Sequence, residues 1–295
     1  MRALAAALAV LAAGCAHRSG RGPARLDAVT VEGLVFRVQY WPEDERTARQ
    51  VRASLALAVP RVARWGRLSV PVLLTIHPSH QALEAATHRE NHPWLRAWAR
   101  YASIDLQSPR TWEPLDFLLG GPTDEQVAEL LTHELVHCVM YQAVGGEYTW
   151  TQRDIPLWFR EGLASVAADQ GYKRLGPEAI WRFYRDVHGS GDGAPGQGQG
   201  IAGARLHGDP LTDPEWPIGE PLYQRDADLV YGTAHWAFRF LLDRYGEAPV
   251  RGVLERMGRG QPFGEAFEAE AGIPPRAFEN DFRRYILWQG WRRDP

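Results

Sequence analysis

The first third of the chain contains short stretches in which apolar and polar positions alternate. Such alternation, in runs rich in β-branched and aromatic residues, is typical of strands that bury one face. Two stretches fit this description, at residues 29–41 and 100–107, and a third, at residues 70–77, is a short apolar run typical of a buried strand. Gly33 divides the first of them, so that this stretch predicts either a strand or a hairpin. The pattern therefore indicates a small sheet in this part of the chain.

Two segments between these stretches have the apolar spacing of helices instead. They lie at residues 43–65 and 79–88. Ser79 is a candidate N-cap for the second helix, because its hydroxyl can accept a hydrogen bond from the first turn. We expect Pro60 to interrupt or end the first helix, because proline lacks the backbone N–H that a helix interior needs.

The remaining residues, 122–295, have a mainly helical pattern. Thr123 and Gln126 have the spacing of a capping box and begin a helix that ends near Val144. Further helices are predicted at residues 154–171, 226–245, 247–257, 262–271 and 275–290. The whole pattern predicts an α+β fold, with a small mixed sheet and covering helices over residues 27–121 and this helical part after it.

Residues 189–221 interrupt the helical part. They are dense in glycine and proline and lack any periodicity. A loop of this length is either functional or mobile, and we expect it to form a mobile flap beside a cleft.

The N-terminus has the pattern of an export signal. An arginine at position 2 is followed by a short apolar run and then by the sequence Ala12-Ala13-Gly14-Cys15. This arrangement resembles a bacterial lipobox, which implies lipidation of Cys15, a signal peptide over residues 1–15 and a flexible tether over residues 16–26. The alternative is an ordinary signal peptide with a chance cysteine. Lipidation would anchor the protein in the bacterial cell envelope, and Ala16 and His17, neither of them acidic, favour the outer membrane or periplasm.

The net charge and the cysteine content argue against two classes of function. The formal net charge of −3 argues against a nucleic-acid partner, which would favour a basic surface. Cys15 and Cys138 are the two cysteines of the chain. If Cys15 carries lipid, Cys138 has no partner for a disulfide. Although Cys138 follows His137 directly, neighbouring helix residues do not face each other, so we expect a buried thiol rather than a nucleophile.

The helix over residues 123–144 carries candidate metal ligands. Its sequence His133-Glu134-Leu135-Val136-His137 places two histidines four residues apart, on one face of the helix. Two imidazoles at this spacing can bind one zinc ion, and Glu134 can take the proton of a zinc-bound water as that water attacks a carbonyl. The alternative is a buried helix whose two histidines merely make hydrogen bonds.

A catalytic zinc ion needs a third protein ligand and one open position. Glu161 is the candidate, because it lies in an otherwise apolar stretch where an unpaired carboxylate is unfavourable. The alternative is that Glu161 pairs with an arginine, such as Arg160 or Arg182.

Two segments of the chain together resemble a known family. They are His133-Glu134-Leu135-Val136-His137 and Pro156-Leu157-Trp158-Phe159-Arg160-Glu161-Gly162-Leu163-Ala164. They resemble the gluzincin metallopeptidases, and most closely the bacterial peptidase MA-like group. A weaker likeness extends from about residue 70 to the C-terminus, including residues 228–246 and 263–285, whereas residues 1–70 resemble nothing in that group.

This resemblance implies a zincin-like fold with Zn²⁺ held by His133, His137 and Glu161. It also implies that an edge strand, expected within residues 101–107, pairs with an extended peptide substrate. Tyr231 matches a tyrosine that binds the developing oxyanion in such enzymes, although a role as a core residue is equally compatible with the sequence.

The chain departs from the family at the residue expected to orient a zinc ligand. Many relatives have an aspartate four residues after the ligand glutamate, and here that position is Ser165. Asp169 lies two helical turns after Glu161, which is a long reach. For His235, one turn after Tyr231, we favour a packing role over a second electrophile.

Three functions remain open on this evidence. The first is an envelope-anchored zinc peptidase that acts on peptides or proteins, and the presence of Glu134 favours it over the second, because the base does not itself bind the metal. The second is a non-catalytic lipoprotein that keeps the zinc-binding fold as a binding or scaffold module. The third is a zinc hydrolase acting on an amide other than a peptide, which the fold alone cannot distinguish.

Overall fold

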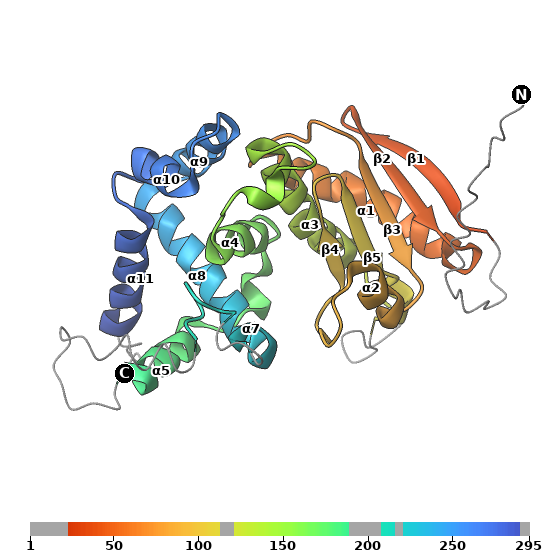
Figure 1. Ribbon diagram of the computed structural model, residues 1–295. Helices are drawn as coiled ribbons and strands as arrows, with labels where there is room; N and C mark the ends of the chain where they lie inside the picture. The colour runs from red at the N-terminus through yellow and green to blue at the C-terminus, as the bar shows by residue number, and fades with distance from the viewer. Residues whose placement is uncertain (1–22, 113–120, 189–207, 216–220, 290–295) are drawn as a thin grey trace, which may run out of the picture.

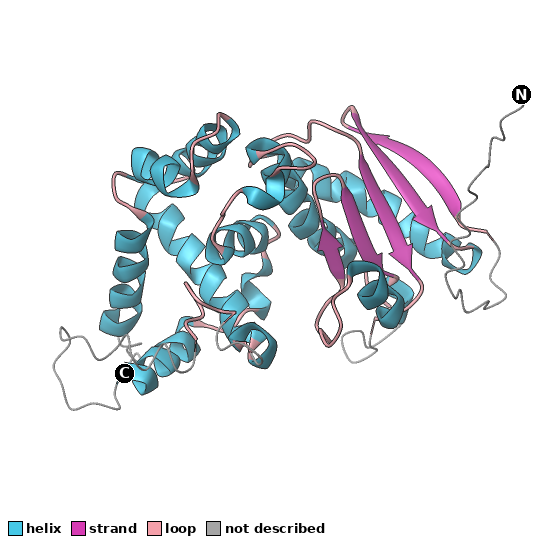
Figure 2. Ribbon diagram, in the orientation of Figure 1, coloured by secondary structure: helices cyan, strands magenta, loops and turns pink. Residues whose placement is uncertain are grey.

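A computed structural model describes residues 23–112, 121–188, 208–215 and 221–289. Its strands gather at one end of the molecule and its helices fill the rest (Figure 2). The expected α+β class is confirmed, with a small mixed sheet followed by a mainly helical part. Cys15, predicted to be lipidated, lies outside the described residues, as does most of the predicted flap.

The sheet has five strands in the order β1-β2-β3-β5-β4. They are β1 (Arg25–Val31), β2 (Leu34–Tyr40), β3 (Val72–His77), β4 (Ala97–Ala99) and β5 (Ser103–Gln107). The pairs β2–β3 and β3–β5 are parallel, whereas β1–β2 and β4–β5 are antiparallel hairpins. Of the strand and the hairpin expected at Gly33, the structure has the hairpin, and Glu32 and Gly33 both have positive φ, as a tight hairpin turn requires.

One face of the sheet supplies the core. Helices α1 (Glu45–Ala63) and α3 (Asp124–Val144) cover this face, while α2 (His80–Thr87) lies on the other face at one end (Figure 1). The buried side chains alternate along the central strands and are Phe36, Val38, Val72, Leu74, Ile76, Ile104 and Leu106. A single cluster of buried apolar side chains runs from this face through α3 to the last helices.

The helical part begins with α3. Its later α-helices are α4 (Leu157–Ala167), α5 (Pro177–His188), α7 (Leu222–Arg225), α8 (Ala227–Tyr245), α9 (Ala248–Gly258), α10 (Phe263–Ala271) and α11 (Pro275–Gln289). Helix α3 packs against α4 and α9. Short 3-10 helices are η1 (Pro42–Asp44), η2 (Pro109–Thr111), η4 (Trp150–Gln152) and η5 (Gln170–Lys173). The predicted capping box of α3 is confirmed, because Thr123 and Gln126 exchange hydrogen bonds between side chain and backbone N–H at 3.2 and 2.8 Å.

Several expected boundaries prove wrong. The segment 100–107 is not one edge strand: β5 lies between β3 and β4, and the short strand β4 forms the edge. The segment 154–171 is not one helix, because α4 ends at Ala167 and Asp169 then adopts a left-handed conformation with φ of 53°. Residues 25 and 26, which the pattern assigned to the tether, pair with β2 instead.

Two helices also differ from the pattern. Helix α1 continues through Pro60, where one helical hydrogen bond is lost, and ends three residues later at Ala63. Helix α5 lies in a segment to which the pattern assigned no element. Its signal was the spacing of Ile180 and Tyr184, both buried, after a proline at the first helical position.

Candidate metal centre

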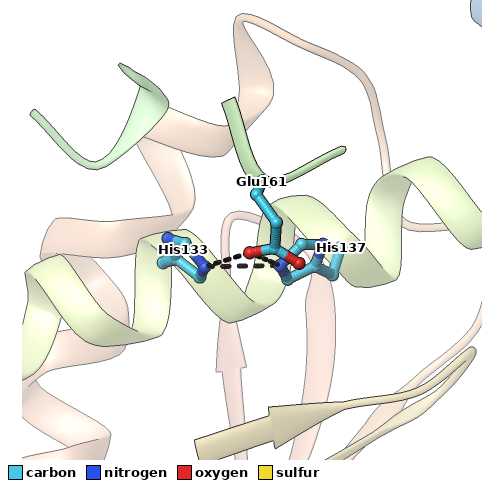
Figure 3. A group of neighbouring side chains, drawn as sticks. All are labelled: His133, His137 and Glu161. Carbon is cyan, nitrogen blue, oxygen red and sulfur yellow. Dashed lines mark hydrogen bonds and ion pairs between the residues drawn. The ribbon is translucent and has the colours of Figure 1, made fainter. Parts of the chain in front are cut away.

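Helix α3 brings the two candidate histidines together. It packs against α1 on one side and against α4 and α9 on the other, so that it is buried almost all round. His133 and His137 are one turn apart, and each is about nine-tenths buried or more. Their Nε2 atoms lie 3.3 Å apart and point to the same side of the helix (Figure 3).

Helix α4 supplies the third group. The Oε2 atom of Glu161 lies 3.4 Å from Nε2 of His133 and 3.5 Å from Nε2 of His137 (Figure 3). Its other oxygen is 3.9 Å from the Nε atom of Arg160, beyond hydrogen-bonding distance. Arg182 pairs instead with Glu178 at 2.6 Å. The alternative in which an arginine is the main partner of Glu161 is therefore not what the structure has.

Close packing of two helices fixes the position of Glu161. The preceding residues, Trp158 and Phe159, are fully buried among aromatic rings of α10 and α11. At Gly162, an added Cβ would lie 2.5 Å from the Ala234 carbonyl oxygen on α8. Any larger residue would therefore push α4 away from α8, and Glu161 would move with it.

The three donor atoms fit a zinc ion. Ligands at about 2.0–2.2 Å from a tetrahedral zinc ion are separated from one another by about 3.3–3.6 Å. The three separations here, 3.3, 3.4 and 3.5 Å, match one triangular face of such a tetrahedron. Two imidazoles and one carboxylate leave the fourth corner for water or substrate, which is the donor set of a catalytic rather than a structural site. Among the described residues, these three form the one group of this kind.

Burial and the neighbouring charges shift the pKa values of all three donors. Burial lowers the pKa of His133 to about 4, so the imidazole is neutral at physiological pH. Burial opposes the charge of Glu161, but His137 and His133 hold the pKa of this carboxyl well below its usual range. Burial likewise disfavours a charge on His137, yet the two neighbouring carboxylates raise its pKa. An ionised carboxylate beside imidazoles is the state that a cation would bind.

Glu134 lies beside the three donors without belonging to them. It is buried, and its carboxylate accepts a hydrogen bond from the backbone N–H of Ala99, on the edge strand β4. Burial raises the pKa of Glu134 to about 7, while His137 lowers it and Glu161 raises it. The group can therefore exchange a proton near neutral pH.

Gln170 orients His133, a role that the sequence did not reveal. Its Oε1 atom lies 3.1 Å from Nδ1 of His133, and its side chain is almost wholly buried. Neither Ser165 nor Asp169, the two positions considered from the sequence, bonds to a ligand histidine. Gln170 follows Asp169 directly, and the left-handed backbone there turns the chain so that Gln170 faces α3.

Tyr231, on α8, lies at the edge of the centre. Its hydroxyl is hydrogen-bonded to the hydroxyl of Tyr223 at 2.6 Å. Burial raises the pKa of Tyr231, and the charges of Tyr223 and Glu161 raise it further, which places Tyr231 within electrostatic reach of the metal donors. This hydrogen bond is compatible both with a core residue and with an oxyanion donor. Tyr223, on α7, is a neighbour that sequence reasoning missed.

The two remaining candidates are packed away from the donors. Nδ1 of His235 is hydrogen-bonded to Ser165 Oγ at 3.0 Å, and an added Cβ on Gly171 would lie 3.0 Å from Nε2 of the same ring. These contacts are those expected of the favoured packing role of His235. Cys138 is fully buried with its Sγ atom 3.2 Å from the Arg100 carbonyl oxygen, and burial raises the pKa of its thiol, as expected for a structural cysteine.

Comparison with known proteins does not add a family to these observations. No protein-family model matches the sequence, and no curated protein matches it as a relative. In the part of the chain that the structure describes, no helix combines the length and the apolar character needed to cross a membrane.

Proposed function

We propose that the protein is a zinc-dependent metallohydrolase of the gluzincin type and that its substrates are peptides. The observation that carries this proposal is the triangle of donor atoms from His133, His137 and Glu161, with Glu134 beside it. A zincin-like fold is the arrangement that best accounts for a metal-binding helix beneath a small sheet.

The chain's own residues have distinct tasks in this reaction. A zinc ion at the triangle would polarise a substrate carbonyl and lower the pKa of a coordinated water to about 7. The Glu134 carboxylate accepts a proton from the attacking water and returns it to the nitrogen of the leaving amine. The hydroxyl of Tyr231 donates a hydrogen bond to the negative charge that develops on the carbonyl oxygen.

The edge of the sheet supports a peptide as substrate. In the β4–β5 hairpin, Arg96 and Arg100 bond to β5 through their backbones, so the backbone groups of Ala97 and Ala99 point away from it. Within the described residues, β4 has a strand neighbour only on the β5 side. An extended peptide added to this edge would run past Ala99, whose N–H contacts Glu134, and so past the metal donors.

The decisive experiment compares zinc content and hydrolysis in one variant. Purified protein from about residue 25 onward is expected to hold about one zinc per chain and to cleave members of a mixed library of unstructured peptides. Glu134→Gln should keep the zinc and lose turnover by about 100-fold or more, because the amide cannot take a proton. Retained hydrolysis in Glu134→Gln would refute the role of this residue as the general base.

The other outcomes of this experiment distinguish between the alternative functions. Zinc binding without hydrolysis of any peptide, but with hydrolysis of small amides, would indicate a non-peptide substrate. Zinc binding without either activity would indicate a non-catalytic binding or scaffold module. Protein that takes up no added zinc would exclude both hydrolases and leave the scaffold module.

We also propose that Cys15 anchors the protein to the bacterial envelope. The support is the lipobox-like sequence that ends at Cys15, together with the short apolar run before it. Radiolabelled palmitate should be incorporated into the full-length protein and not into Cys15→Ser. Equal labelling of both proteins would contradict the assignment.

A further inference from the structure

A network of polar side chains lies behind His133. Gln170 Oε1 contacts the Nδ1 atom of His133 at 3.1 Å, and the same oxygen accepts a hydrogen bond from Nη2 of Arg174. Arg174 also donates from Nε to Ser165 Oγ at 3.1 Å, and its guanidinium lies over the ring of Tyr231 at 5.0 Å. Arg174 therefore contacts both the residue that orients a metal ligand and the proposed oxyanion donor.

The chemistry of these groups fixes the direction of each hydrogen bond. A guanidinium can only donate, so the end of the Gln170 amide that meets Arg174 is the oxygen. That same oxygen faces His133, and it can only accept. Nδ1 of His133 must therefore carry the proton, which leaves the lone pair on Nε2, the atom that points to Glu161.

If the amide were turned over, the opposite tautomer would result. The NH₂ group of Gln170 would then donate to Nδ1 of His133, and the proton would move to Nε2. An Nε2–H group cannot bind a metal ion. In this structure a flipped amide would also direct its NH₂ group at the guanidinium of Arg174, which is an unfavourable donor–donor contact.

We propose that Arg174 and Gln170 act as a tautomer lock: Arg174 fixes the orientation of the Gln170 amide, and Gln170 thereby holds Nε2 of His133 ready for the metal before the metal arrives. Both are positioning residues, since neither contacts the metal-binding atoms. The inference rests on the proposed zinc site, and it adds the device that prepares one of its ligands.

The segment that carries Gln170 is itself fastened to α3. Glu129, one turn before His133, accepts a hydrogen bond from the Tyr172 hydroxyl at 2.7 Å and forms an ion pair with Lys173. These two contacts and the Gln170 contact all join η5 to the same face of α3. Gln170 is therefore held in register with His133, which a positioning role requires.

Ser165 has a different task from that expected of its position. Where related enzymes have a carboxylate that receives the histidine proton directly, Ser165 accepts from Arg174 and contacts His235. Ser165 thus bonds to Arg174, and Arg174 bonds to Gln170, which accepts the hydrogen bond from His133. This arrangement replaces one charged contact with a chain of three hydrogen bonds from Ser165 to His133.

The first test measures zinc affinity in matched variants. Gln170→Met keeps the length of the side chain but removes the acceptor, whereas Gln170→Glu keeps an acceptor. Competition with a chromogenic zinc chelator should show binding about 10- to 100-fold weaker in Gln170→Met and within about threefold of the parent in Gln170→Glu. Arg174→Met should weaken binding to a smaller extent, and the surface variant Arg182→Met should leave it unchanged.

The second test reads the tautomer directly in the zinc-free protein. Long-range ¹H–¹⁵N NMR spectra separate the two neutral tautomers of each histidine ring. In the parent protein, His133 should be protonated at Nδ1, and Arg174→Met should give a mixture of both tautomers. A purely structural role for Arg174 would change thermal stability but not this signature.

The outcomes separate this inference from the proposed function. Unchanged zinc affinity in folded Gln170→Met, or an unchanged His133 tautomer in Arg174→Met, would overturn the lock while leaving a zinc hydrolase intact. Conversely, a parent protein that binds zinc and loses affinity in Gln170→Met, but cleaves no peptide, would support the lock and refute the peptidase. If Gln170→Met does not fold, the NMR measurement on Arg174→Met decides.

Discussion

Helix α3 and the 3-10 segment η5 meet at the same metal centre and are held in place by different forces. Helix α3 is a long helix in the middle of the apolar core, so its two histidines are positioned by packing. Segment η5 has four residues and is fastened by polar contacts of Gln170, Tyr172 and Lys173. Substitutions in the core of α3 should therefore lower the stability of the fold, whereas substitutions in η5 should lower the affinity for the metal.

The largest expected effect comes from the core side of α3. Leu135 lies between the two ligand histidines in sequence but is fully buried in the core. Leu135→Ala should lower the free energy of unfolding by about 2–5 kcal/mol, because it removes apolar contacts and leaves a cavity. Urea denaturation of the zinc-free protein measures this change. A loss of zinc affinity without a loss of stability would contradict the view that apolar packing positions α3.

The next effect concerns a ligand on the other side of the same helix. His137→Ala removes one of three protein donors, and zinc binding free energies of about 10–16 kcal/mol are shared among the ligands. Affinity should fall by about 3–4 kcal/mol, or roughly 100- to 1000-fold. Chelator competition measures it, with Leu135→Ala as the control that destabilises without touching a donor. An affinity within tenfold of the parent would remove His137 from the site.

A third substitution tests whether polar contacts hold η5 at the metal centre. Glu129→Gln keeps the shape of the side chain but removes the charge that pairs with Lys173. Zinc affinity should fall by about tenfold. This is the lower limit of the effect expected for residues that support a metal ligand, because Glu129 acts on His133 only through Gln170. Thermal unfolding should change little in the same protein. A large loss of stability with normal zinc affinity would show that Glu129 supports the fold and not the metal centre.

The smallest effect is expected at the start of α3, far from the metal centre. Thr123→Ala removes the hydroxyl of the capping box, which should cost about 1 kcal/mol of unfolding free energy. Zinc affinity should remain that of the parent, since His133 lies more than two turns further along the helix. Thr123→Ser, which keeps the hydroxyl, serves as the control. A change in affinity would show that α3 does not act as a rigid support.

The same contrast explains what the sequence could predict. The limits of α3 followed from its capping box and its glycines, and the histidine spacing is a property of any helix. His133, His137 and Glu161 were therefore predicted as a group, and the structure brings them within 3.5 Å of one another. The histidine pair needs only the local geometry of a helix, whereas Glu161 was chosen because a carboxylate in an apolar stretch needs a partner and because of the resemblance to the gluzincins.

Gln170 and β4 escaped prediction because they depend on the rest of the fold. The position of Gln170 follows from a left-handed residue at Asp169, which no local pattern required there. Strand β4 has three residues, too few for an alternating pattern, and it is a strand because β5 pairs with it. The expected edge strand was therefore placed one strand too far inward.

Lys173 gives the fold an unexpected practical property. It is the single lysine of the chain, and it lies in η5, half-exposed and paired with Glu129. A reagent that modifies amines would thus attach a fluorophore, apart from any at the N-terminus, at one defined place beside the metal centre. Such a label would also remove the charge that pairs with Glu129, so that labelling itself releases one of the contacts that fasten η5.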